Sequence, residues 1–188
     1  MHRLFAGIAI PGDIQDAVST LQSKLNGARW VEPENYHIPL AFMGEIERPV
    51  AEDADHALAQ IALPAFELAL RGVGCFGKGA QARALWVGVE DRSGRAELLA
   101  RLQSKVANAL RATGIQLDSR KFNPHVTIAR LKQPEPRAIG RFMEQHNLFR
   151  SRPFTVDSFC LFESHLRSDG AQYRVLVDYP LAGAEAAL

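Results

Sequence analysis

The segment FNPHVTIAR, residues 122–130, has the pattern of a β-strand with one chemically active face. Side chains alternate between the two faces of a strand, so His125 and Thr127 lie on one face and Val126 lies on the other. An imidazole beside a hydroxyl, with Arg130 just beyond, can hold a phosphate through charge-assisted hydrogen bonds. The segment therefore predicts a phosphate-binding strand, and the rest of the chain can be read outward from it.

A second strand-like segment, YHIPLAFM at residues 36–43, contains His37 and ends at Gly44. The chain runs through the order strand, helix, strand, helix, strand, and then repeats this order with one strand added. We expect strands at 3–10, 36–43, 66–76, 85–90, 122–131, 154–164 and 172–179, the last two joined by a turn at 167–170. We expect helices at 13–26, 50–63 and 94–113, and one introduced by Pro134 and Pro136 that ends near Asn147.

These elements indicate an internal repeat of about 3–76 and 84–180. The apolar run LFAGI at 4–8 is echoed 81 positions later by LWVGV at 85–89, and the two histidines are 88 positions apart. We predict one α+β domain over 1–188, built of two interleaved lobes related by a pseudo-twofold axis. Each lobe is expected to have a mainly antiparallel sheet with helices outside, and a cleft between the sheets would let His37 and His125 face each other.

The composition restricts the class of protein. A net charge of +1 argues against a nonspecific nucleic-acid clamp, although a few local cations could still hold one phosphate. Cys75 and Cys160 have no metal or redox spacing and lie in apolar runs, so we expect buried free thiols. The N-terminus lacks the pattern of a signal peptide, and no apolar run reaches the roughly 20 residues of a membrane helix. We expect a cytoplasmic monomer without membrane contact.

Two histidines are suited to paired proton transfer, because an unperturbed imidazole titrates near pH 6.5. One neutral imidazole can take a proton from water or a ribose hydroxyl, and a protonated one can give a proton to a leaving oxygen. A hydroxyl two residues after each histidine would lie on the same face and could donate to a phosphate oxygen as charge develops there.

The segments NYHIPLAFMGE at 35–45 and PHVTIAR at 124–130 resemble the two signature strands of the 2H phosphoesterases, in which histidine, any residue, threonine or serine, and an apolar residue follow one another (HxTx). The similarity is greatest to the RNA 2′,3′-cyclic phosphodiesterases, also called 2′-5′ RNA ligases or LigT-like proteins. The stretches RLF at 3–5, RWV at 29–31 and LFES at 161–164 carry it over nearly the whole chain.

This resemblance implies a bilobal fold, no cofactor or metal, and hydrolysis of a 2′,3′-cyclic phosphate on RNA ends or small nucleotides to a 2′-phosphomonoester. It makes His37 the proton donor and His125 the proton acceptor, an order that nothing else in the sequence decides. Thr127 becomes a phosphate donor, and Arg130 and Phe42 become candidate substrate contacts. Two alternatives stay open: ligation that forms a 2′-5′ bond, and an RNA-end-binding module with decayed catalysis.

Pro39 departs from the pattern, because it stands where the first threonine is expected. Proline has neither a hydroxyl nor a backbone N–H, so one of the two phosphate donors is missing. Loss of one such donor can cost about 10²–10³ in rate. We therefore expect a weakened or re-specialised site in which Thr127 and nearby cations hold the phosphate, and we expect the proline-containing strand to lie at a sheet edge.

Overall fold

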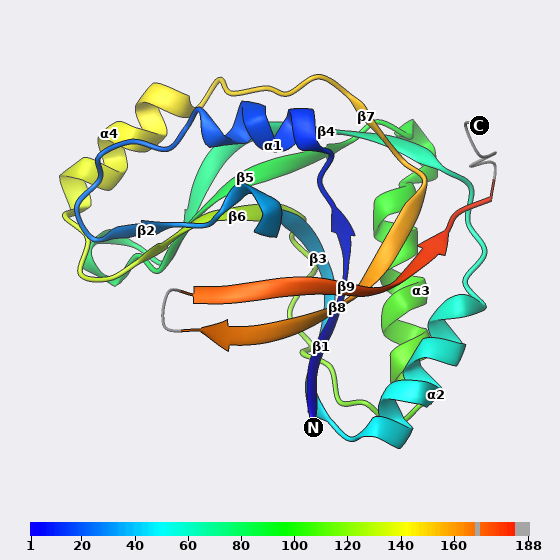
Figure 1. Ribbon diagram of the computed structural model, residues 1–188. Helices are drawn as coiled ribbons and strands as arrows, with labels where there is room; N and C mark the ends of the chain where they lie inside the picture. Colours follow the sequence, from blue (N-terminus) through cyan, green and yellow to red (C-terminus); the bar gives the residue numbers. More distant parts are fainter. Residues whose placement is uncertain (168–169, 183–188) are drawn as a thin grey trace.

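The computed structural model describes residues 1–167 and 170–182 and has two antiparallel sheets with four α-helices (Figure 1). The strands are β1 (His2–Ala9), β2 (Ala28–Trp30), β3 (His37–Ile46), β4 (Phe66–Phe76), β5 (Ala84–Asp91), β6 (His125–Leu131), β7 (Phe154–Val156), β8 (Ser158–Arg167) and β9 (Gly170–Pro180). The helices are α1 (Gly12–Ser19), α2 (Arg48–Ala59), α3 (Leu98–Ala112) and α4 (Pro136–His146). The predicted α+β class is confirmed.

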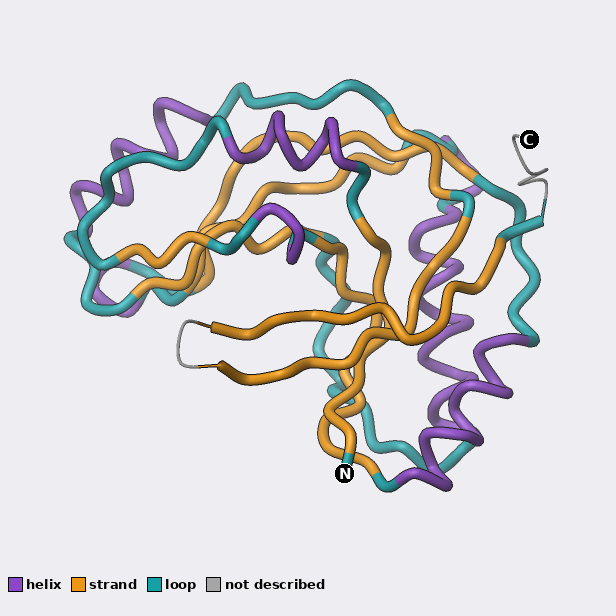
Figure 2. The backbone as a smooth tube through the Cα atoms, viewed as in Figure 1, coloured by secondary structure: helices purple, strands orange, loops and turns teal. Residues whose placement is uncertain are grey.

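Each sheet combines strands from both ends of the chain. One sheet has the order β3-β1-β8-β9 and the other has the order β2-β6-β5-β4-β7. The first sheet therefore takes β8 and β9 from the C-terminal part, while β4 leaves the N-terminal part to join the second sheet. Figure 2 shows the two groups of strands as separate layers, with α2 and α3 beside one and α1 and α4 beside the other.

The two histidine strands pair with their neighbours in the same way. Between β3 and β1, Ala9 lies opposite His37, and Leu40 is an extra residue in the ladder. Between β6 and β5, Gly88 lies opposite His125, and Ile128 is the extra residue. Both bulges thus fall three positions after the histidine. Ala9 and Gly88, the residues opposite the two histidines, are 79 positions apart, whereas the similar apolar runs in the sequence are 81 apart. The two offsets differ by two residues, and a shift of two along a strand keeps each side chain on the same face.

Two expected elements differ most from the structure, and one short strand was not expected. The helix expected at 13–26 ends at Ser19, where Ser19 Oγ donates to the Asp16 carbonyl and Thr20 Oγ1 donates to the Ala17 carbonyl, in competition with the helical pattern. The strand expected at 154–164 is divided at Asp157, because β7 pairs with β4 whereas β8 pairs with β1. The short strand β2 was not anticipated. The turn expected at 167–170 includes residues 168 and 169, which lie outside the described residues.

Other local predictions are confirmed. Pro39 stands in β3, which is an edge strand. The glycines of β4 mark a bend, since the ladder with β5 shifts at Gly72, whose φ is +66°. Cys75 and Cys160 are free thiols, the second buried and the first partly buried.

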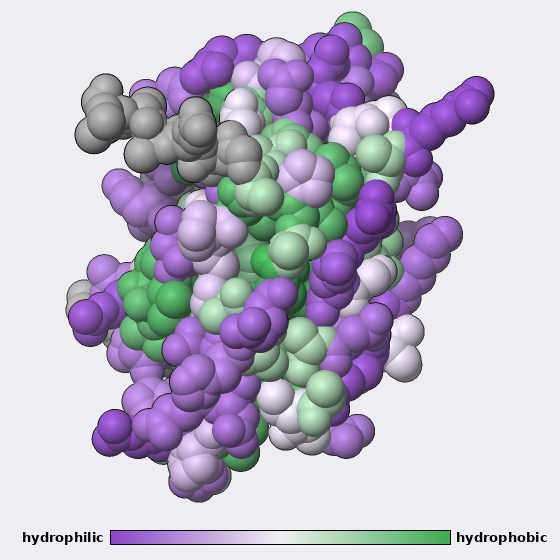
Figure 3. Space-filling view, turned by 90° about the vertical axis from the view of Figure 1, so that its right-hand side faces the viewer, coloured by the Kyte–Doolittle hydropathy of each residue, from purple (hydrophilic) through white to green (hydrophobic). Residues whose placement is uncertain are grey.

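A large apolar cluster joins the inner faces of the sheets to the helices. Along β1, Leu4, Ala6 and Ile8 belong to this cluster, whereas Phe5 points to the opposite face and packs with Cys160 and Phe162. In the side view of Figure 3, apolar residues gather in the middle of the face and hydrophilic residues form most of its border. No helix in the described part of the chain is long and apolar enough to cross a membrane.

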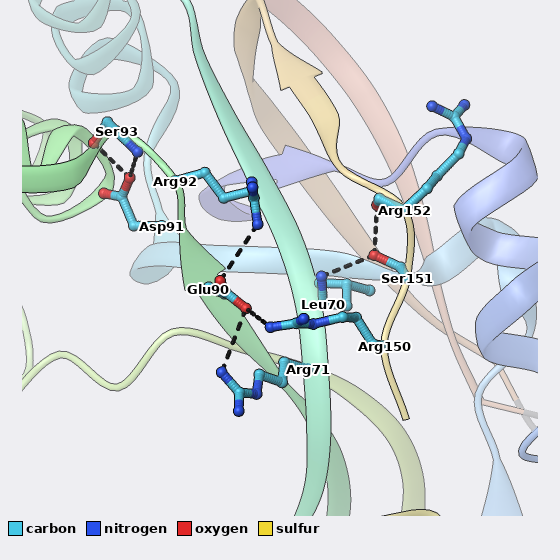
Figure 4. Close-up of polar contacts among 9 residues, drawn as sticks. All are labelled: Leu70, Arg71, Glu90, Asp91, Arg92, Ser93, Arg150, Ser151 and Arg152. Atoms are coloured by element: carbon cyan, nitrogen blue, oxygen red, sulfur yellow. Dashed lines mark hydrogen bonds and ion pairs between the residues drawn. The ribbon is translucent and has the colours of Figure 1, made fainter. Parts of the chain in front are cut away.

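Polar contacts fasten the second sheet to its surroundings. Ser151 is buried, accepts a hydrogen bond from the Leu70 N–H at 2.9 Å, and donates to the Arg152 carbonyl (Figure 4). Asp91 and Ser93 accept the backbone N–H groups at the start of α3 at 2.9 Å. These contacts satisfy backbone donors that would otherwise lack partners, and they hold α3 beside the cleft described next.

Candidate active site

A cleft of about 540 Å³ contains all six residues that the sequence singled out. These residues are His37, Pro39, Phe42, His125, Thr127 and Arg130. They come from β3 and β6, the two strands that carry the histidines and belong to different sheets. The walls also include residues of α3, the loop before β6, the segment before β3, Phe76 of β4 and Tyr173 of β9.

Each histidine is held by an equivalent hydrogen bond to a backbone carbonyl. The Nδ1 atom of His37 lies 2.7 Å from the Asn35 carbonyl, and the Nδ1 atom of His125 lies 2.7 Å from the Asn123 carbonyl. A carbonyl oxygen can only accept, so each Nδ1 carries a proton. In the neutral imidazole, Nε2 is then the unprotonated nitrogen and can accept a proton. In the imidazolium form the same atom donates one.

Aromatic rings enclose His37. Its ring centroid lies 4.7 Å from that of Phe5, 4.9 Å from that of Tyr173 and 5.8 Å from that of Phe162. Burial among these rings lowers the pKa of His37 to about 4, because the charged imidazolium loses hydration there. The hydrogen bond to the Asn35 carbonyl acts in the opposite direction, whereas His125 and Arg130 add to the lowering.

His125 has a more open environment. The Phe76 ring meets it edge-on at 4.7 Å, and the Trp86 ring centroid lies 6.4 Å away. Burial lowers the pKa of His125 as well, with a further contribution from Arg130. Trp86 can lie here because its indole covers Gly74 of β4, where an added Cβ would overlap the ring. Without bound substrate, both histidines are therefore neutral at pH 7.

The two halves of the cleft differ in their hydroxyl groups. Thr127 is partly buried, lines the cleft, and pairs with Trp86 in the ladder between β5 and β6. Its hydroxyl makes no hydrogen bond within the described part of the chain, so it is available to a ligand. Pro39 occupies the equivalent position two residues after His37 and offers no donor. The hydrogen-bonding potential at the +2 position is thus present only beside His125.

Positive charge gathers at the cleft although the chain is nearly neutral overall. Arg111, Arg120, Lys121 and Arg130 line it, whereas Asp118 is the one acidic residue among the lining residues of the described chain. Asp118 forms an ion pair with Arg120 at 2.6 Å. Phe42 also faces the cleft and is 62% exposed, which is unusual for a large apolar side chain. Its ring centroid lies 5.5 Å from that of Phe5.

Several lining residues were missed by the sequence reasoning. Asn35 and Asn123 each stand two positions before a histidine, and this shared spacing was a visible signal for them. Tyr173 and Phe76 had no such signal, because β9 and β4 reach the cleft only through the sheet order. Within residues 1–167 and 170–182, no three His, Cys, Asp or Glu side chains are grouped so as to hold a metal ion.

A family model described as the 2′-5′ RNA ligase superfamily matches residues 10–167. The chain belongs to the 2′-5′ RNA ligase superfamily, a LigT-like branch of the 2H phosphoesterases, as its two histidine strands had predicted. Among its relatives, the RNA 2′,3′-cyclic phosphodiesterase of Aeropyrum pernix is 34% identical over 155 residues, which are 82% of this chain and 86% of that protein.

Solved structures share the fold. The protein TT0787 of Thermus thermophilus has a TM-score of 0.74 and 26% identity, and the match covers 97% of this chain and 100% of that one. Escherichia coli LigT complexed with 3′-AMP has a TM-score of 0.75 and 22% identity, with 96% and 98% covered.

Proposed function

We propose that this chain hydrolyses 2′,3′-cyclic phosphates at RNA ends or on small nucleotides to 2′-phosphomonoesters, as an RNA 2′,3′-cyclic phosphodiesterase. The observation that carries the proposal is the matched pair of histidines in one cleft, each with Nδ1 on a backbone carbonyl and Nε2 left for chemistry. The name of the Aeropyrum pernix relative and the 3′-AMP complex of E. coli LigT support the same class of ligand.

The reaction needs one proton taken and one given. Nε2 of His125 accepts a proton from water as the water oxygen bonds to phosphorus. The bond between phosphorus and the 3′ oxygen breaks, and Nε2–H of His37 protonates that oxygen. The deeper burial of His37 supports this order, because the imidazolium with the lower pKa is the stronger acid and the less perturbed imidazole is the better base.

Substrate binding lets His37 take up the missing proton from solvent. Both imidazoles are neutral in the free protein, so the acid must be charged when the complex forms. A phosphate anion beside His37 raises its pKa by stabilising the imidazolium. Solvent exchange then resets the pair after each turnover, with a proton leaving His125 and another reaching His37.

The remaining cleft residues hold the substrate in this proposal. The Thr127 hydroxyl donates to a non-bridging phosphate oxygen as negative charge develops, and the Arg130 guanidinium lies on the same strand beyond it. Exposed Phe42 offers a ring face for a base. All of these groups come from one chain, so the proposed reaction needs no residue from a second copy of the protein.

The test is turnover of 2′,3′-cyclic mononucleotides and of RNA ending in a cyclic phosphate by the wild type and the His125→Ala variant. We expect turnover to a 2′-phosphomonoester by the wild type and a loss of at least about 10³-fold in the variant, typical of removing a general base together with its positioning. If the wild type and a His37→Ala/His125→Ala variant bind the cyclic phosphate equally well and neither turns it over, the proposal is rejected in favour of a binding module.

A second candidate, a binding module with decayed catalysis, is favoured by one observation. Pro39 removes the hydroxyl from one half of the site. The same cleft could also run the reverse chemistry, in which a 5′ hydroxyl replaces water and a 2′-5′ bond forms. Product analysis with and without a 5′-hydroxyl RNA distinguishes these cases.

A further inference from the structure

The β8–β9 hairpin reaches from its own sheet towards β2 of the other sheet (Figure 1). Near its outer end, Gly170 approaches the Arg29 guanidinium of β2. Further along β9, Tyr173 enters the cleft and packs edge-on against His37 at 4.9 Å. Because β9 is an edge strand, its outward N–H and C=O groups have no neighbouring strand to pair with.

The Asn35 side chain takes the place of that neighbouring strand. Its Nδ2 donates to the Ala171 carbonyl at 3.1 Å, and its Oδ1 accepts the Tyr173 N–H at 3.1 Å. The backbone carbonyl of the same residue accepts the Nδ1–H of His37 at 2.7 Å. One residue is therefore bonded both to the ring that does the chemistry and to the strand whose tyrosine covers that ring.

We propose that Asn35 is a positioning residue that fastens β9 over His37 and thereby keeps this imidazole desolvated and correctly oriented. A catalytic role for Asn35 rests on the proposed function, whereas its effect on the solvation of His37 can be measured in the ligand-free protein. Phe5 of β1 also packs edge-on against the Tyr173 ring, but among the described residues only Asn35 adds side-chain hydrogen bonds to the β9 backbone at Ala171 and Tyr173.

Asn123 provides an internal comparison. Its carbonyl holds His125 at the same 2.7 Å, yet within the described residues its side-chain amide makes no hydrogen bond. The two asparagines therefore share the backbone role and differ in the side-chain role. Substitution to alanine keeps both carbonyls and removes both amides, so only the Asn35 substitution should release a strand.

The test is NMR titration of the His37 imidazole in the ligand-free protein, for the wild type, Asn35→Ala and Asn123→Ala. We expect the pKa of His37 to rise by at least about one unit in Asn35→Ala, as water reaches the ring, and to be unchanged in Asn123→Ala. Hydrogen exchange at the Tyr173 N–H should accelerate in Asn35→Ala alone. An unmoved pKa of His37 together with faster exchange at Tyr173 overturns the positioning role, and so does unchanged exchange.

Two further variants guard against a trivial loss of folding. Asn35→Ser shortens the side chain while keeping a polar group, and Tyr173→Ala removes the covering ring without touching Asn35. If Asn35 acts through β9, the Asn35→Ala/Tyr173→Ala double variant raises the pKa of His37 no further than the larger single effect. Additive shifts contradict the inference. The pKa of His37 and hydrogen exchange at Tyr173 are measured without turnover. A failed cyclic-phosphate assay would therefore reject the proposed function, and these two measurements would still test the role of Asn35.

Discussion

Acidification should unfold this protein partly through one side chain, His37. Burial lowers its pKa to about 4 in the folded state, against 6.5 for a solvated imidazole. A proton therefore binds the unfolded chain more tightly than the folded one. The resulting loss of stability is absent above pH 6.5, begins as the pH falls through that value, and is complete only below the folded pKa.

The size of this effect follows from the two pKa values. Linkage between pH 7.5 and pH 4.5 gives a loss of about 2.5 kcal/mol from this single group. Other titrating groups contribute too, and they are removed by comparing the wild type with His37→Asn. Urea unfolding at both pH values, followed by tryptophan fluorescence, should show a free energy of unfolding that falls about 2.5 kcal/mol less in the variant than in the wild type.

A matched control is His56→Asn, because His56 is exposed on α2 and lies outside the cleft. Its pH dependence should follow that of the wild type within about 0.5 kcal/mol, the usual range for a surface substitution. If the free energy of unfolding falls by the same amount in His37→Asn and in the wild type on acidification, then the aromatic enclosure does not suppress charging of His37, and the lowered pKa described for this imidazole is wrong.

Three further outcomes are expected. Thr127→Val should lower kcat for a cyclic-phosphate nucleotide by about 10²–10³-fold with little change in stability, since it removes the hydroxyl donor beside His125; unchanged kcat would show that the hydroxyl does not serve the reaction. Pro39→Thr should raise kcat on the same substrate, by up to a similar factor, and no increase would mean that the proline is not what limits turnover. Gly74→Ala should destabilise the protein by about 1–3 kcal/mol in urea unfolding, because its Cβ overlaps the Trp86 indole; Gly140→Ala, in open space on α4, serves as its control.

Short-range pattern was sufficient for much of the fold. The strand β4 was expected at 66–76, where it occurs, because its apolar residues and the proline before it are local features. The helix expected at 13–26 was too long, because Ile14, Val18, Leu21 and Leu25 keep an apolar period beyond the point where the backbone leaves the helix. The division at Asp157 was not predicted, although Asp157 and Ser158 interrupt the apolar residues there, because only the sheet order shows that the two segments pair with different strands.

The sequence by itself indicated that His125 shares a strand face with Thr127 and His37 shares one with Pro39, because side chains alternate along a strand. It did not determine how those histidines titrate. The desolvation of His37 comes from Phe5, Phe162 and Tyr173. The backbone N–H of Tyr173 is hydrogen-bonded to Asn35, which is 138 positions away in the chain. The alternation of side chains along a strand depends only on neighbouring peptide units. The burial of His37 depends on strands that are distant in sequence and that only the sheet order brings together. The tertiary structure therefore decided that the two halves of a nearly symmetric site are electrostatically unequal.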